Sequence, residues 1–176
     1  MKPELEATLK ALKKAGWKVE MRPAELAEVS LPEAVRERFG KLPDDYMEFL
    51  ASVSKCANPE NTSCFLTADD FCGGPGATFG WDWIEQAFVP GPDDADDLAA
   101  WQAFWREHLL IFMSVGMDYA YLALRLGQCE SGSVVGAYSP DFEGTGKVCD
   151  SFTHLCVMLT QYYEDGIQPD SLVSIL

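Results

Sequence analysis

One group of residues in this chain has the types that covalent catalysis needs. Cys149 lies five residues before His154, and Cys156 lies two residues after it. A thiol beside a general base is an activated nucleophile. The spacing argues against this chemistry, because a strand-to-helix junction is expected between Cys149 and His154, and helix positions two apart do not face each other. With two histidines in the whole chain, we predict that the protein is not an enzyme and keep catalysis as a distant alternative.

Metal and cofactor sites need dense, regularly spaced ligands, which this sequence lacks. None of the cysteines forms a C-x-x-C pair, and neither His108 nor His154 extends them into a zinc pattern. The glycine-rich stretch at 73–76 lacks the Lys and the Ser or Thr of a phosphate-binding loop. We therefore predict no catalytic residue, no metal and no cofactor. The cysteines occur at positions 56, 64, 72, 129, 149 and 156.

The charged residues favour a binding protein with a basic partner. The chain has 28 Asp and Glu against 13 Lys and Arg, a net charge of −15. The excess lies in residues 41–176, which carry −16, whereas residues 1–40 carry +1. Such a field repels phosphate backbones and anionic lipids and attracts cations. We expect no nucleic acid and no membrane among the partners. The alternative is that the acidity serves solubility alone.

Two segments have the composition of a partner-binding surface. One is an aromatic stretch between loops, and exposed tryptophans are typical of interface hot spots. The other is the acidic run at 93–97. Each has a structural alternative, because a tryptophan can belong to the core and carboxylates at a helix N-terminus stabilise the helix without a partner. The candidate residues are Trp81, Asp82 and Trp83 in the first segment and Asp93, Asp94, Asp96 and Asp97 in the second.

Three further acidic residues are candidates because of their place beside strands. Asp118 precedes an alternating segment, and Asp141 and Glu143 lie in a glycine-rich loop. Loops on a rigid scaffold often carry binding contacts. The alternatives are that Asp118 bonds backbone N–H groups in its own turn, and that the loop is simply solvated.

Helices are predicted where apolar residues recur on one face. We expect an amphipathic helix over residues 3–15, a short helix from Pro32 to about Gly40, and a helix that begins at Pro43. A fourth should span 93–107, and a last one should begin at Asp150 or Ser151 and end at Gly166. The helix after Pro43 has the apolar stripe Tyr46, Phe49, Leu50 and Val53, and the helix at 93–107 has the apolar face Leu98, Trp101, Phe104 and Trp105.

After residue 107 the hydrophobic period becomes that of strands. Strands are predicted at 109–115, 119–126, 133–138 and 147–149, with two more segments at 17–21 and 64–67 and a loop at 55–63. The connections between the later strands are short, which favours antiparallel pairing. We predict a single α+β domain, with an antiparallel sheet of about four to six strands flanked by helices that pack on one sheet face.

Three stretches, in chain order, carry a family resemblance. They are Leu42-Pro43-x-x-Tyr46-x-x-Phe49-Leu50, Val115-Gly116-x-Asp118-Tyr119-x-Tyr121, and Ser133-Val134-Val135-x-x-Tyr138 followed by Ser151-Phe152-x-x-Leu155. This pattern resembles the SUKH superfamily, which includes fungal Smi/Knr cell-wall regulators and bacterial toxin-immunity proteins. The similarity covers roughly residues 30–165. The aromatic and acidic insert at 79–107 is longer than a minimal member needs, which leaves the subfamily open.

The resemblance implies a non-catalytic protein-binding module. In bacteria it implies an immunity protein that neutralises a toxin, often a nuclease, and the acidic surface suits a basic toxin domain. The alternative is a Smi/Knr-like scaffold that binds host proteins. We expect a SUKH-like domain at 30–176 and an N-terminal helix and arm at 1–30, all in one globular unit. Because the N-terminus has no apolar signal region, we expect a cytoplasmic protein. The edge strands of an open sheet can pair with a second copy of the chain, so a homodimer is a further expectation.

Overall fold

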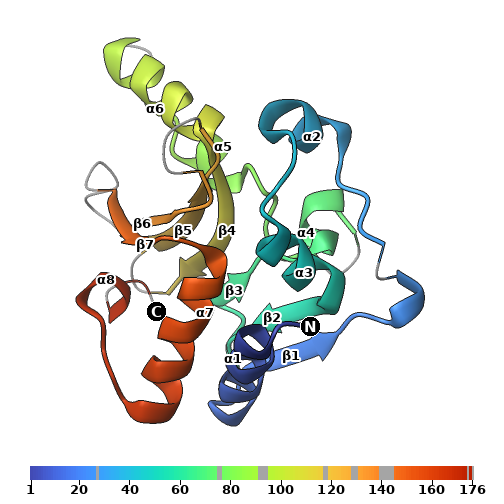
Figure 1. Cartoon of the computed structure of the whole chain (residues 1–176). Helices are drawn as coiled ribbons and strands as arrows, with labels where there is room; N and C mark the ends of the chain where they lie inside the picture. Colours follow the sequence, from blue (N-terminus) through green and yellow to red (C-terminus); the bar gives the residue numbers. More distant parts are fainter. Residues whose placement is uncertain are drawn as a thin grey trace.

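The chain folds around one antiparallel sheet, shown in a computed structural model (Figure 1). The structure describes residues 1–26, 28–74, 77–90, 95–116, 119–127, 131–138, 145–173 and 175. Over these residues the sheet has seven strands in sequence order, each antiparallel to the next. The strands are β1 (Lys18–Met21), β2 (Val53–Ala57), β3 (Ser63–Phe65), β4 (His108–Val115), β5 (Tyr119–Arg125), β6 (Val134–Tyr138) and β7 (Gly146–Cys149).

The α+β class and the antiparallel sheet are confirmed, with one strand where a loop was expected. Residues 53–57 form β2, although Val53 continues the helical stripe and residue 55 was placed in a loop. Val53 is completely buried, as the stripe predicted, but in an extended backbone. It pairs with Met21 of β1, a partner that is distant in the sequence.

The predicted helices begin and end close to their sequence signals, whereas α4, α5 and α8 were not predicted. Pro43 precedes α3, Ser151 caps α7 by accepting a hydrogen bond from the His154 N–H at 3.1 Å, and Gly166 ends the π-helical turn Gln161–Asp165 that continues α7. The α-helices are α1 (Pro3–Lys14), α2 (Glu33–Phe39), α3 (Asp44–Ser52), α4 (Ala68–Cys72), α5 (Trp83–Ala87), α6 (Ala95–Glu107), α7 (Phe152–Thr160) and α8 (Asp170–Val173).

The main core lies between one sheet face and helices α1, α3 and α7. Phe65 and Phe112 are paired on β3 and β4 with ring centroids 4.8 Å apart, and Phe49 of α3 packs on Phe65 at 6.2 Å. Phe152 brings α7 onto the same group, 5.4 Å from Phe49. The Thr8 hydroxyl of α1 donates to the Cys156 carbonyl oxygen of α7 at 2.6 Å. These helices therefore form one layer over the sheet.

A second, smaller layer lies on the opposite face, which corrects the prediction that helices pack on one face. Neighbouring residues of a strand point to opposite faces. Leu122 faces the main core, because its pairing partner is Phe112. Tyr121 points the other way and contacts Trp105 of α6 at 5.3 Å, and Tyr119 contacts Trp83 of α5 at 6.2 Å. Helices α5 and α6 therefore cover the second face.

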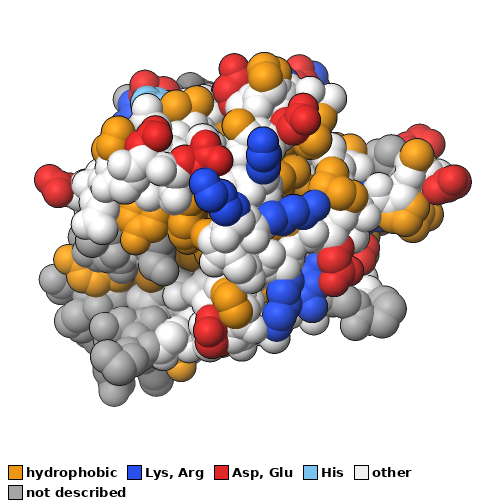
Figure 2. Space-filling view, turned by 90° about the horizontal axis from the view of Figure 1, so that it is seen from below, with side chains coloured by type: hydrophobic (Ala, Val, Ile, Leu, Met, Phe, Trp, Pro, Cys, Tyr) orange, Lys and Arg blue, Asp and Glu red, His pale blue; other side chains and the backbone are white. Residues whose placement is uncertain are grey.

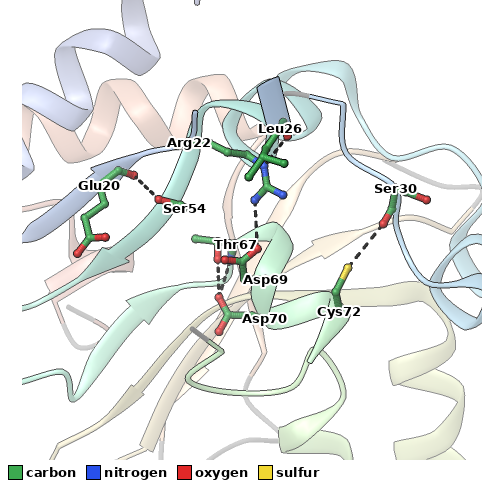
Figure 3. Close-up of polar contacts among 9 residues, drawn as sticks. All are labelled: Glu20, Arg22, Leu26, Ser30, Ser54, Thr67, Asp69, Asp70 and Cys72. Atoms are coloured by element: carbon green, nitrogen blue, oxygen red, sulfur yellow. Dashed lines mark hydrogen bonds and ion pairs between the residues drawn. The ribbon is translucent and has the colours of Figure 1, made fainter. Parts of the chain in front are cut away.

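The segment after β1 is attached to α4 by polar contacts (Figure 3). The Arg22 guanidinium forms an ion pair with Asp69 at 3.2 Å and donates to the Leu26 carbonyl oxygen at 2.7 Å. The Cys72 thiol donates to the Ser30 carbonyl oxygen at 3.6 Å. These contacts hold the stretch between β1 and α2 against the body of the protein.

The lysines of α1 and β1 lie at the end of the molecule remote from α6. In Figure 1, α1 and β1 lie at one end and α6 projects from the other. The view onto the first end shows Lys and Arg side chains gathered over its middle (Figure 2). The lysines of α1 and β1 in this region, Lys10, Lys13, Lys14 and Lys18, are all exposed. The remote end, which carries α5 and α6, is thus separated from the basic part of the chain.

Candidate functional site

The structure brings five of the predicted site residues to α5 and α6. Trp81 and Asp82 immediately precede α5, Trp83 is its first residue, and all three are half-buried. Asp96 and Asp97 lie exposed in the first turn of α6. The other predicted residues, Asp93, Asp94, Asp118, Asp141 and Glu143, fall outside the described part of the chain.

The two tryptophans near α5 pack in different directions. Trp81 meets Phe39 of α2 edge-on at 6.1 Å, and the guanidinium of Arg38 lies over the Trp81 ring at 5.5 Å. Trp83 contacts Phe88 at 6.0 Å and Tyr119 at 6.2 Å. Each indole therefore packs against neighbouring rings while part of it stays exposed to solvent. Neither tryptophan is a fully buried core residue, and a role in partner binding stays a prediction for both.

Arg38 and Glu85 connect α2 to α5 in a geometry that the sequence did not predict. Both terminal nitrogens of Arg38 donate to the Glu85 carboxylate, at 2.8 and 3.0 Å. The backbone oxygen of Glu85 accepts from the indole N–H of Trp101 in α6 at 3.2 Å. This chain of contacts fixes α5 between α2 and α6. No local sequence signal marks the pair, because its members are 47 residues apart.

Helix α6 is only partly a core helix, which differs from its predicted apolar face. Of the four predicted face residues, Trp105 alone is buried, at 2 % exposure. Leu98, Trp101 and Phe104 are half-buried. The helix meets the sheet through its last turns, and its first turns extend beyond the sheet (Figure 1). Its aromatic residues therefore form a surface as well as a core contact.

Two hollows flank the Trp101 side chain. The first has a volume of about 390 Å³ and the second about 300 Å³. The first is lined by Pro90, Asp97, Ala100, Trp101, Phe104, Tyr121 and Thr145. The second is lined by Arg38, Asp82, Glu85, Gln86, Val89, Leu98, Trp101 and Gln102.

We call this region the α5–α6 surface. It combines half-buried aromatic rings, two hollows and four carboxylates. In the second hollow, the Asp82 carboxylate accepts a hydrogen bond from the Gln86 side chain at 2.5 Å, which holds it along α5. Aromatic residues are enriched in the cores of protein–protein interfaces, and polar residues surround them at the rim. The α5–α6 surface consists of Trp81, Asp82, Trp83, Glu85, Asp96, Asp97, Trp101 and Phe104.

The Cys/His group does not have the environment of a nucleophilic site. Burial raises the pKa of Cys149 to about 11 and that of Cys156 to about 12, so both are neutral thiols near pH 7. His154 is half exposed and lies 4.0 Å from the exposed Asp150. In the described part of the chain, no group of three or more His, Cys, Asp or Glu residues is arranged to hold a metal ion.

The family comparison matches residues 25–156 to the SMI1 / KNR4 family (SUKH-1). The chain belongs to the SUKH family. The match includes the Leu42–Leu50 stretch, which leads into α3 and whose buried Tyr46 hydroxyl donates to the Leu66 carbonyl oxygen at 3.1 Å. It also includes the whole α5–α6 surface. No curated protein and no solved structure matched the chain.

The SUKH assignment agrees with the fold and narrows the function. The α+β domain with its antiparallel sheet is consistent with the SUKH fold, and the predicted resemblance is confirmed. The SUKH family includes immunity proteins and is generally non-catalytic. No helix in the described segments has both the length and the apolar composition to cross a bilayer.

Proposed function

We propose that this SUKH protein is an immunity protein that binds and neutralises a basic toxin domain in the cytoplasm through the α5–α6 surface. The observation that carries the proposal is the half-buried aromatic group beside exposed carboxylates at one end of the molecule. Trp81, Trp83 and Trp101 each pack against neighbouring side chains and are still partly exposed to solvent. Rigid aromatic anchors lose little conformational entropy on binding, so their contact area converts efficiently into affinity.

Charge supports a basic partner. The protein carries −15 overall, and the basic residues 1–40 contribute +1. The lysines of α1 and β1 lie at the end remote from α6 (Figures 1 and 2). A basic domain is therefore attracted toward the α5–α6 end during its approach, which raises the association rate and makes that rate sensitive to salt. A toxin that itself binds nucleic acid has a surface of this sign.

Membership of the SMI1 / KNR4 family also supports a second candidate function. In this alternative, the protein is a regulatory scaffold that binds host proteins and never meets a toxin. Its partner has no need to be basic, so its binding is expected to respond little to salt. Salt dependence and toxin protection therefore separate the two functions.

The test combines capture with protection. The tagged protein is incubated with lysate of its source cells at low and at high salt, and captured proteins are identified by mass spectrometry. The captured candidate is then expressed in a sensitive host with and without this protein. We expect one basic toxin domain, captured less efficiently at high salt, whose toxicity disappears on coexpression. Capture of a host protein with no toxicity, unaffected by salt, contradicts the immunity role and favours the scaffold.

A matched pair of variants tests the surface. Asp96→Asn/Asp97→Asn removes two exposed charges from α6, and Asp165→Asn/Asp170→Asn removes two exposed charges near the C-terminus. We expect the first variant to slow association with the toxin and the second to leave it nearly unchanged. Equal effects of the two variants would show that only net charge matters and that the α5–α6 surface is not the contact.

A further inference from the structure

Among the residues that the structure describes, the larger hollow of the α5–α6 surface is lined by aromatic rings and by the acidic residue Asp97. It lies between α6 and β5 and has a volume of about 390 Å³. Trp101, Phe104 and Tyr121 contribute the rings, and Asp97 contributes the carboxylate. Tyr121 is completely buried and so forms the base of the cavity, while Asp97 is exposed at the helix surface.

Contacts with neighbouring groups hold each ring in place. The Trp101 indole N–H donates to the Glu85 backbone oxygen at 3.2 Å. The hydroxyl groups of Tyr121 and Thr145 share a hydrogen bond of 2.8 Å. Phe104 stacks on the His108 ring at 3.9 Å and meets Tyr121 at 69°. The walls are therefore set before a ligand arrives, which lowers the entropic cost of filling the cavity.

The chemistry of these walls favours a flat cation. The faces of aromatic rings carry partial negative charge and attract cations, most strongly at tryptophan. A guanidinium group is planar and weakly hydrated, so it stacks on rings with a smaller desolvation cost than an ammonium group. Asp97 can accept its N–H groups at the rim while the alkyl stem covers apolar wall.

We propose that this cavity binds the guanidinium group of an arginine side chain presented by the partner. This inference takes its partner, a basic toxin domain, from the proposed function. Arginine binding by the cavity can be tested in the isolated protein. It names the kind of residue that anchors a basic domain on the α5–α6 surface. It also assigns Trp101, Phe104 and Asp97 as the residues that determine specificity.

The experiment is an NMR titration of the full-length ¹⁵N-labelled protein with N-acetyl-arginine methylamide. The indole N–H resonance of Trp101 is assigned with a Trp101→Phe variant. Citrulline and lysine derivatives of the same form are the matched probes, because citrulline keeps the shape of arginine without its charge. We expect a saturable shift of the Trp101 resonance with arginine, a weaker one with lysine and none with citrulline. No shift with arginine, or an equal shift with citrulline, overturns the proposal.

Two variants locate the binding. Asp97→Asn is expected to weaken arginine binding by roughly two- to fivefold, as removal of an exposed ion pair does. Phe104→Leu is expected to abolish the shift, while Asp165→Asn leaves it unchanged. Unchanged arginine binding by both cavity variants would overturn the assignment. If the cavity does not bind arginine, the tests of toxin capture and protection still decide the immunity role. If it binds arginine but no toxin partner is found, the immunity role is contradicted and the arginine site is not.

Discussion

Arg38 of α2 holds Glu85 of α5 through two parallel hydrogen bonds of 2.8 and 3.0 Å. The same guanidinium lies over the Phe39 ring at 5.3 Å and the Trp81 ring at 5.5 Å. Both side chains of the ion pair are only about a quarter exposed, at 21 % and 24 %. The pair is therefore better shielded from water than an ordinary surface salt bridge, and it fixes the helix on which the α5–α6 surface depends.

Arg38→Ala is expected to lower the free energy of unfolding by about 1–2 kcal/mol, because an ion pair and a cation–π contact are lost together. Urea unfolding followed by tryptophan fluorescence measures the change. Lys41→Ala is the control, since Lys41 and Asp44 form an ion pair in which both side chains are about 80 % exposed. We expect no measurable change there. If both variants change the free energy of unfolding equally, the Arg38–Glu85 pair stabilises the protein no more than an exposed ion pair does.

Gly136→Ala is expected to destabilise the fold by about 1–3 kcal/mol, the usual cost of overpacking. An added Cβ would lie 2.7 Å from Cδ1 of Ile175 and 3.0 Å from the Tyr121 backbone oxygen. Ile175→Val removes Cδ1, so the double variant is expected to lose less stability than the sum of the single variants. Urea unfolding of all three variants checks this coupling, and simple additivity would refute the contact between the C-terminal segment and β6.

The buried thiols are expected to resist alkylation in the native protein. Burial raises the pKa of Cys64 and Cys156 to about 12 and that of Cys149 to about 11, so the reactive thiolate is scarce at pH 8. Cys72 is exposed. Treatment with iodoacetamide followed by peptide mass spectrometry should show rapid modification of Cys72 and slow modification of the other three, until urea is added. Rapid native modification of Cys149 would favour the enzyme alternative.

Stability is expected to fall as the pH drops below about 7, partly because of His108. Burial lowers the pKa of His108 below its ordinary value of 6.5, while its ring N–H donates to the Phe104 oxygen at 2.7 Å. The unfolded chain therefore binds a proton at a higher pH than the folded chain. The stability contributed by neutral His108 is present above pH 6.5 and is lost as the pH falls toward the lowered pKa.

Urea unfolding at pH 7.5 and pH 5.5 measures this effect. His108→Gln is expected to reduce the difference in unfolding free energy between the two pH values. His154→Gln is the control, because the His154 side chain is half exposed. A pH dependence that is the same in the wild type and in His108→Gln would show that other groups cause it.

The helices of the main core were predictable because their evidence is local. Tyr46, Phe49 and Leu50 recur at helical spacing after Pro43, and all three are buried in α3. A buried stripe needs only a repeating pattern within ten residues to be recognised. The later strands were predictable for the same reason, since short connections allow only antiparallel neighbours.

Strand β2 and the second helical layer were not predictable in this way. Val53 continues the period of α3, but pairing with Met21 of β1 makes it a strand residue. Trp101 and Phe104 share a helix face with Trp105, yet only Trp105 is fully buried, whereas the other two pack partly exposed against the core. The spacing of hydrophobic residues predicts which side chains are buried. The element that packs against them comes from distant parts of the sequence, so the local pattern does not predict it.

The sequence by itself determined the acidic character of the protein, its SUKH resemblance, its antiparallel α+β class and the choice of Trp81–Trp83 as candidate contacts. The tertiary structure alone decided that these residues share a surface with Asp97, Trp101 and Phe104, and that an ion pair from Arg38 supports it. The reason is physical. Charge and periodicity are properties of neighbouring residues along the chain, whereas a cavity and an ion pair across 47 residues exist only once folding has closed the intervening loops.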